Sequence, residues 1–161
     1  MKKVYVNEDV CMGCGLCQVY CSTAHSKSKD ILKAYKKESP KPLPRIRIER
    51  HDETAFSLQC RHCDMPVCVY SCLTGAMRKD PKTGVVTVDS EKCIGCWTCI
   101  VACANGAIAK DPERKVAVKC DLCPDEEIPV CVAQCPNQAL YVCDGDMIEY
   151  EVATPVAIRT G

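Results

Sequence analysis

Four groups of cysteines constrain the fold of this chain more than any other feature of its sequence. Each group begins with a Cys-x2-Cys pair and ends with a Cys-x3-Cys pair, and the spacing between these pairs varies from two to seven residues. The grouped residues are Cys11, Cys14, Cys17 and Cys21; Cys60, Cys63, Cys68 and Cys72; Cys93, Cys96, Cys99 and Cys103; and Cys120, Cys123, Cys131 and Cys135. Any fold of these 161 residues must therefore accommodate sixteen closely spaced thiols.

The spacing within the groups favours iron–sulfur clusters over structural zinc. The first three thiolates of a Cys-x2-Cys-x2-Cys loop lie on one tight turn and can reach three irons of a single cubane. The fourth thiolate, one helical turn further on, points away and can bind the other cluster of a two-cluster pair. Structural zinc prefers two Cys-x2-Cys pairs separated by a longer stretch, which fits these groups badly. Sixteen ligands, at four per cluster, predict four 4Fe–4S clusters.

The sequence near the N-terminus favours metal ligands over disulfides. Residues 1–11 contain two lysines, but no apolar segment follows them and no twin-arginine pair is present. We therefore expect a cytoplasmic chain with reduced thiols, in which dense cysteine indicates metal. No apolar run approaches the length of a membrane span, so direct membrane insertion is not expected.

The supply of ordinary apolar side chains is small. The hydrophobic fraction of 47% includes 17 cysteines, and the chain has one Phe and one Trp. Buried clusters would have to replace the missing side-chain packing, so we expect folding to depend on metal.

Charge is segregated along the chain although the net charge is zero. Residues 22–50 carry nine Lys or Arg against three acids, whereas residues 121–151 carry eight acids and no Lys or Arg. Two solvated faces would give this pattern, and so would a polarised surface that orients protein partners. The basic run lacks the interleaved aromatic pattern of nucleic-acid-binding proteins, so no nucleic-acid partner is expected.

The cysteine pattern repeats within the chain. Val4–Cys14 matches Val86–Cys96, and Met65–Cys72 matches Ile128–Cys135. The first two groups therefore form one half and the last two form the other, each with the shape of a bacterial two-motif ferredoxin. The expected fold is α+β, a duplicated bacterial ferredoxin-like fold with short hairpins and helices around four clusters. It should occupy residues 1–150, followed by a C-terminal tail over 151–161.

Short β-hairpins are expected after three of the four groups, because turn residues there separate short β-branched runs. The expected strand pairs are 76–77 with 85–88, 108–109 with 116–118, and 139–142 with 147–151. Short helices are expected to carry the fourth cysteine of each group.

After the first group, residues 22–59 replace the hairpin with a long insertion arm. Residues 26–37 are expected to form a short helix, and the prolines at 40, 42 and 44 favour an extended segment. Residues 45–49 are expected to pair with residues 54–59. The arm either covers a cluster or forms a docking surface.

Five other residues deserve a prediction. Cys143 is expected to be a partly buried spare thiol in a strand, with a replacement ligand or an oxidation-sensitive site as the alternative. His25, His51 and His62 form no catalytic constellation, and the backbone of His62 is expected to donate to cluster sulfur. Trp97 is expected to pack against a cluster and shield it from water. No phosphate loop, catalytic carboxylate pair or nucleophile–base pair is visible, so no catalytic site is expected.

The run from Cys93 to Ile108 and the two Pro-Val-Cys-Val sequences, 66–69 and 129–132, resemble the four-cluster polyferredoxin family. Its members are electron-transfer subunits of molybdopterin oxidoreductases, formate-linked hydrogenases and carbon monoxide dehydrogenases. Residues 21–26 and 60–66 are most similar to the small CooF type that serves carbon monoxide dehydrogenase.

The resemblance implies a protein that passes low-potential electrons from carbon monoxide dehydrogenase to a hydrogenase or a flavin-dependent NAD(P) oxidoreductase. Two alternatives stay open. The chain could serve a formate dehydrogenase, a hydrogenase or another molybdopterin oxidoreductase, or it could be a non-redox structural metal protein.

The resemblance also implies how the ligands are shared, because the family pairs group two with group three and group one with group four. The implied ligand sets are Cys93, Cys96, Cys99 and Cys72; Cys60, Cys63, Cys68 and Cys103; Cys120, Cys123, Cys131 and Cys21; and Cys11, Cys14, Cys17 and Cys135. Some relatives replace one cysteine and hold a three-iron cluster. Here every ligand position is cysteine, which implies four cubanes.

Overall fold

The computed structural model describes residues 2–144 as short helices and short strands. The predicted strand at 147–151 and the predicted tail at 151–161 lie outside these residues. The helices are η1 (Glu8–Val10), α1 (Leu16–Ala24), α2 (Ile31–Lys36), α3 (Val67–Tyr70), α4 (Thr98–Ala102) and α5 (Val130–Ala133). The strands are β1 (Lys2–Val6), β2 (Ile46–His51), β3 (Thr54–Gln59), β4 (Met77–Lys79), β5 (Val86–Val88), β6 (Ile108–Asp111), β7 (Val116–Lys119) and β8 (Leu140–Asp144).

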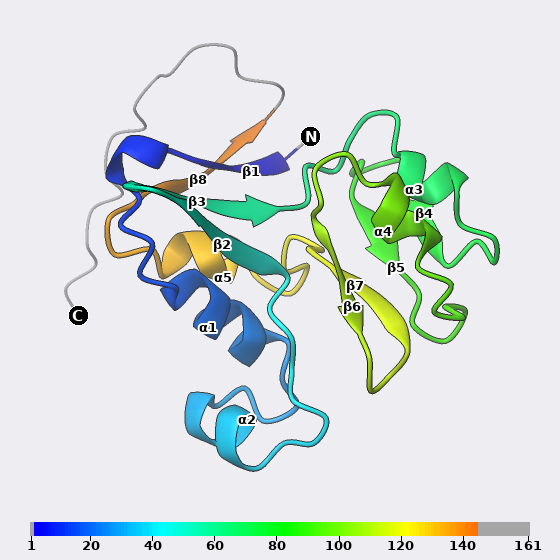
Figure 1. The fold of residues 1–161 in the computed structure, drawn as a ribbon, viewed down its shortest axis with the longest axis horizontal. Coiled ribbons are helices and arrows are strands. Elements are labelled where there is room, and N and C mark those ends of the chain that lie inside the picture. Colours follow the sequence, from blue (N-terminus) through cyan, green and yellow to red (C-terminus); the bar gives the residue numbers. More distant parts are fainter. Residues whose placement is uncertain (1, 145–161) are drawn as a thin grey trace.

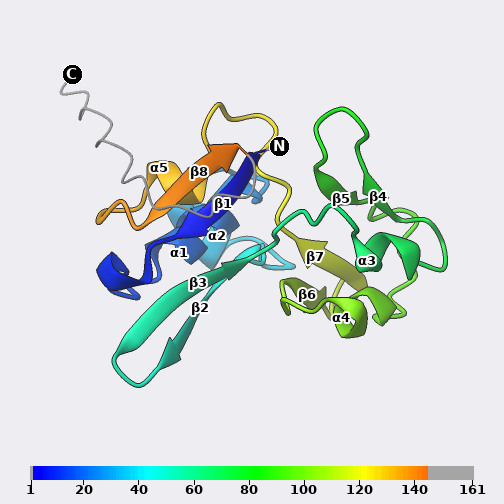
Figure 2. The same ribbon diagram turned by 90° about the horizontal axis from the view of Figure 1, so that it is seen from above.

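These elements form two lobes (Figures 1 and 2). Lobe 1 contains β1, η1, α1, α2, β2, β3, α5 and β8, and lobe 2 contains α3, β4, β5, α4, β6 and β7. The chain passes into lobe 2 after β3 and returns after β7, so Cys60 and Cys120 stand at the two crossings. Lobe 2 is thus one continuous segment, whereas lobe 1 is assembled from both ends of the described chain.

Every strand pairs with one antiparallel partner in the described residues. The pairs β4–β5 and β6–β7 confirm two predicted hairpins, and β2–β3 confirms the strand pair expected in the insertion arm. The partner of β8 is β1, with Val4 opposite Val142, and this pairing was not predicted. Hairpin signals report only neighbouring segments, and β1 and β8 are separated by almost the whole described chain.

The prediction that helices carry the fourth cysteine of each group is wrong for three groups. Cys21 lies within α1, but Cys72 and Cys135 follow the ends of α3 and α5. Cys103 is the C-cap of α4 and has an extended backbone, with φ −78° and ψ 105°. The physical reason is length, because α3, α4 and α5 have only four or five residues and end before the fourth cysteine.

Helix α2 is shorter than the helix predicted over 26–37. Asp30 has an extended backbone and its carboxylate accepts a hydrogen bond from the Lys33 N–H at 2.8 Å, which makes it the N-cap. The preceding residues form a turn in which the Ser26 hydroxyl accepts from the Lys29 N–H at 2.9 Å. The helix therefore begins at Ile31.

The two hydrophobic cores are small and contain cluster-group cysteines. The buried set in lobe 1 is Val4, Cys17, Cys21, Ile46, Cys131 and Leu140, and the set in lobe 2 is Met77, Val86, Cys99, Ile108 and Ala117. Nothing among the helices of residues 2–144 has the length and apolar character needed to cross a membrane.

Candidate iron–sulfur sites

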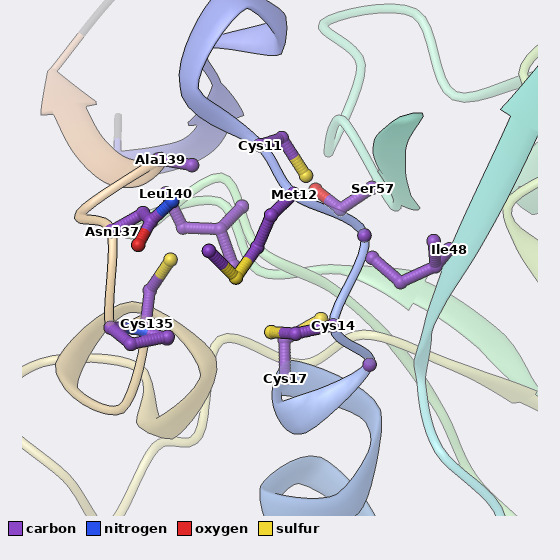
Figure 3. Close-up of a pocket in the computed structure, with 13 residues that line it drawn as sticks. Cys11, Met12, Cys14, Cys17, Ile48, Ser57, Cys135, Asn137, Ala139 and Leu140 are labelled. Atoms are coloured by element: carbon purple, nitrogen blue, oxygen red, sulfur yellow. The ribbon is translucent and has the colours of Figure 1, made fainter. Parts of the chain in front are cut away.

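The first candidate site, site A, is a hollow in lobe 1. Its cysteines are Cys11, Cys14, Cys17 and Cys135. Figure 3 shows the thiols of Cys11, Cys17 and Cys135 facing a common space from different sides, with the Met12 side chain between them in this view. Ile48 of β2 also lines the hollow, so the insertion arm covers this site. That covering is one of the two roles predicted for the arm.

A second hollow, site D, lies in lobe 2. Its cysteines are Cys72, Cys93, Cys96 and Cys99. Backbone N–H groups of Met77 and Ala117 each donate to a cysteine sulfur, Cys72 and Cys93 respectively, at 3.4 Å. Trp97 lines the hollow, as expected for a residue that shields a cluster from water.

A third hollow, site C, is lined by residues of α3 and by the C-terminal end of α4. Its cysteines are Cys60, Cys63, Cys68 and Cys103. The His62 N–H donates to the Cys60 sulfur at 3.4 Å, and its donation to cluster sulfur stays a prediction. The His62 ring has a role that the sequence did not indicate, because its Nδ1 accepts from the Val86 N–H at 2.9 Å. Burial lowers the pKa of His62 to about 3, so this ring is neutral.

Site B brings Cys21 of α1 next to the fourth cysteine group. Burial raises the pKa of Cys120 to about 12 and also raises the pKa of Cys123 and Cys131. In all three, the neighbouring Cys21 adds to the rise. The Cys21 sulfur accepts a hydrogen bond from the Arg45 N–H at 3.2 Å, so the insertion arm covers this site as well.

A polar network surrounds site B and was missed by sequence reasoning. The Asp121 carboxylate pairs with His25 Nε2 at 3.1 Å and with the Arg45 guanidinium. His25 Nδ1 also lies 2.8 Å from the Cys21 carbonyl. Burial alone would lower the pKa of His25, but the hydrogen bonds to Asp121 and Cys21 outweigh it and raise the pKa to about 9. A carboxylate between two grouped cysteines was the one signal in the sequence that could have directed attention here.

The four sites follow one another in the order A, B, C, D. Cys17 of site A contributes to the raised pKa of Cys131 in site B, so these thiols are neighbours. In the same way, Cys60 of site C contributes to the raised pKa of Cys120 in site B. Cys68 of site C contributes to the raised pKa of Cys99 in site D. The order therefore runs from lobe 1 through the chain crossings into lobe 2.

The residues present fit 4Fe–4S clusters. Burial raises the pKa of both Cys17 and Cys99 to about 11, and neighbouring thiols add to the rise, which is the crowding expected of a ligand shell. Gly13 and Gly95 adopt left-handed backbones at φ 64° and 68°, as the tight ligand turns require. Cys143 lies half-buried in β8 outside the four sites, as predicted.

Fold and sites together define a cysteine-ligated iron–sulfur protein. Residues 52–145 match the 4Fe–4S dicluster domain family, and the chain belongs to this family. It therefore carries multiple 4Fe–4S clusters.

Three relatives agree with this assignment. The chain is 35% identical over 159 residues to the "Iron-sulfur protein" of Rhodospirillum rubrum, covering 89% of this chain and 82% of the relative. It is 34% identical over 156 residues to the electron transport protein HydN of Escherichia coli, covering 86% of each. Protein NrfC of Escherichia coli is 32% identical over 141 residues, covering 83% of this chain and 61% of NrfC. The chain is an iron–sulfur electron-transfer protein.

Proposed function

We propose that this protein holds four 4Fe–4S clusters, one at each of sites A to D, and conducts electrons along them between two redox enzymes. The observation that carries the proposal is the arrangement of sixteen cysteines as four sets of four in a linear order. Each set coincides with a ligand set implied by the family resemblance. The protein has no catalytic site of its own in this proposal.

The sets pair the cysteine groups differently from the sequence repeat, which placed groups one and two in one half and groups three and four in the other. In each, one group supplies three ligands and its partner group supplies the fourth, as in a two-cluster ferredoxin. Sites A and B use the first and fourth groups, and sites C and D use the second and third. We infer one four-cluster domain over residues 1–150, with residues 22–59 inserted.

A bound 4Fe–4S cluster accepts and returns single electrons. The chain's own residues hold it through four thiolates, and the backbone N–H groups at sites B, C and D stabilise the sulfur charge. The exposed cysteines are Cys14 at site A, Cys63 at site C and Cys96 at site D, whereas site B has none. Sites A and D lie at the two ends of the order and each has an exposed cysteine, so they suit exchange with partners, and site B suits internal transfer.

For the partners, we propose carbon monoxide dehydrogenase as the electron donor and a hydrogenase or a flavin-dependent NAD(P) oxidoreductase as the acceptor. The donor proposal rests on the likeness of residues 21–26 and 60–66 to the CooF type. Formate dehydrogenase and other molybdopterin oxidoreductases are the second candidates. We place the protein in the cytoplasm, where so many thiols stay reduced until clusters bind.

Helix α2 supports docking guided by charge. Asp30 and Glu38 use their carboxylates to cap backbone N–H groups, whereas the exposed lysines around them, including Lys33, Lys36 and Lys37, face solvent. The net positive surface adjoins α1, which carries Cys17 and Cys21 on its buried side. An acidic partner surface would be attracted to this arm.

The proposal is tested by mixing the oxidised protein with reduced carbon monoxide dehydrogenase under carbon monoxide and following the bleaching of visible absorbance. We expect bleaching to be faster than with an unrelated ferredoxin and to slow as salt is added. Equal bleaching rates for the two proteins would exclude carbon monoxide dehydrogenase as the donor. Dithionite alone must also bleach the protein, and a colourless protein would overturn the electron-transfer proposal itself, because zinc is redox-silent.

A further inference from the structure

Lys119, the last residue of β7, is buried at the crossing between the lobes. Its side chain is 2% exposed, although lysine almost always keeps its ammonium in water. The ammonium donates to the Cys120 carbonyl at 2.6 Å and to the Val86 carbonyl. It is thus held between strand β5, which carries Val86, and the first cysteine of the fourth group.

The partners of Lys119 within residues 2–144 are carbonyls, and no carboxylate there forms an ion pair with it. An ammonium has three protons to donate, and carbonyl dipoles do not neutralise its charge. Removing such a cation from water is strongly unfavourable unless an anion compensates. Negative charge close to the Lys119 ammonium would therefore offset the cost of burying it.

Two sites supply candidates for that negative charge. The ammonium donates to the carbonyl of Cys120, a cysteine of site B, and to the carbonyl of Val86, which lines the hollow of site C. One ammonium therefore lies beside both sites.

We propose that Lys119 is the shared counter-ion of the clusters at sites B and C and holds both reduction potentials above the values they would otherwise have. This inference rests on the proposed function. A cluster bound by four thiolates is an anion, and reduction adds a further negative charge, which a fixed cation stabilises strongly in a low-dielectric interior. Because one cation serves both sites, it favours reduction at each without opposing transfer between them.

The test compares Lys119→Met, which removes the buried charge, with Lys119→Arg, which keeps it. The matched control is Lys115→Met, which removes an exposed charge from the β6–β7 hairpin. Anaerobic redox titration followed by electron paramagnetic resonance gives the potential of each cluster. The signals are assigned beforehand with Cys120→Ser for site B and Cys68→Ser for site C.

We expect Lys119→Met to shift the potentials of sites B and C to more negative values and to leave those of sites A and D unchanged. The shift should persist at high salt, since buried charges are screened weakly. Lys119→Arg and Lys115→Met should leave the potentials of sites B and C near those of the wild type.

Unchanged potentials in a fully loaded Lys119→Met protein would overturn the proposal. If that variant loses the clusters of sites B and C, Lys119→Arg decides the matter. Clusters retained at sites B and C in Lys119→Arg support the counter-ion role. Loss of those clusters in Lys119→Arg as well rejects it, because the shape of the lysine side chain and not its charge would then be what the sites require. The iron and sulfide content of the wild-type protein tests the proposed function separately.

Discussion

At the scale of single residues, Asp121 links three parts of lobe 1. Its carboxylate pairs with the guanidinium of Arg45 in the insertion arm and with the ring of His25, which directly follows α1. Asp121 itself lies between Cys120 and Cys123 in the sequence. The proposed cysteine ligands were predictable from spacing alone. This network was not, because its partners are 76 and 96 residues apart along the chain and no local pattern marks them.

The network predicts a pH-dependent contribution of His25 to stability. Its pKa is raised from 6.5 to about 9, so its stabilising effect is full below pH 6.5 and is lost as the pH rises through 9. We expect His25→Gln to lower the free energy of unfolding by roughly 2 kcal/mol at pH 6 and by much less at pH 10. Anaerobic denaturant titrations at the two pH values measure this.

His51→Gln is the control, since the His51 side chain is 87% exposed. It should have little effect at either pH. An equal loss of stability for His25→Gln at pH 6 and pH 10 would contradict the ion pair with Asp121.

The ligand sets predict which cysteine substitutions share a spectroscopic signal. Cys72→Ser and Cys93→Ser should perturb the same cluster, because both cysteines line site D. Cys63→Ser and Cys103→Ser should perturb a different one, at site C. Electron paramagnetic resonance of the reduced variants distinguishes these signals. A signal shared by Cys72 and Cys63 would instead mean that the four cysteines of each sequence group bind one cluster.

At the scale of elements, local signals predicted what local residues determine. The hairpins β4–β5 and β6–β7 follow from turn residues between β-branched runs, and β2–β3 follows from the alternating pattern over residues 45–49. The pairing of β1 with β8 depends instead on bringing the two ends of the described chain together, which no hairpin signal encodes. The ends of the short helices were missed because cluster-binding loops interrupt them after one turn.

A glycine pair tests how a ligand turn depends on a neighbouring hairpin. Gly95 and Gly75 both have positive φ, so a side chain is strained at either position. A Cβ at Gly95 would lie 2.5 Å from the Lys115 carbonyl oxygen, whereas nothing lies within 4 Å of one at Gly75. We expect Gly75→Ala to cost about 1 kcal/mol of stability and Gly95→Ala clearly more.

The expected readout for Gly95→Ala is loss of the site D signal, since Gly95 lies between Cys93 and Cys96. The other three signals should remain. Iron content and electron paramagnetic resonance measure both variants side by side. Equal behaviour of the two alanine variants would show that the contact with Lys115 is unimportant.

At the scale of the whole molecule, we expect the clusters to take the place of a conventional core. The two buried hydrophobic sets are small, and both include cluster-group cysteines. We expect anaerobically purified protein to carry on the order of sixteen irons and sixteen sulfides. Chelation under air should then unfold the chain, because metal binding supplies folding free energy.

Far-ultraviolet circular dichroism during iron loss measures this dependence. The signal should fall together with the visible absorbance of the clusters. A native signal after complete iron loss would mean that side-chain packing alone maintains the fold. Tightly bound zinc with negligible sulfide would contradict the cluster assignment.

The continuity of lobe 2 has a consequence for biosynthesis. All eight proposed ligands of sites C and D lie between Cys60 and Cys103, so a growing chain presents two complete sites before lobe 1 can close. The thiols of the first group must wait for residues 120–135, on the order of ten seconds at ordinary rates of translation. The topology thus predicts an order of cluster loading in which the fourth cysteine group, the last of the four to be synthesised, completes sites A and B with the first group. Because it waits longest, we expect the first group to be the most vulnerable to oxidation.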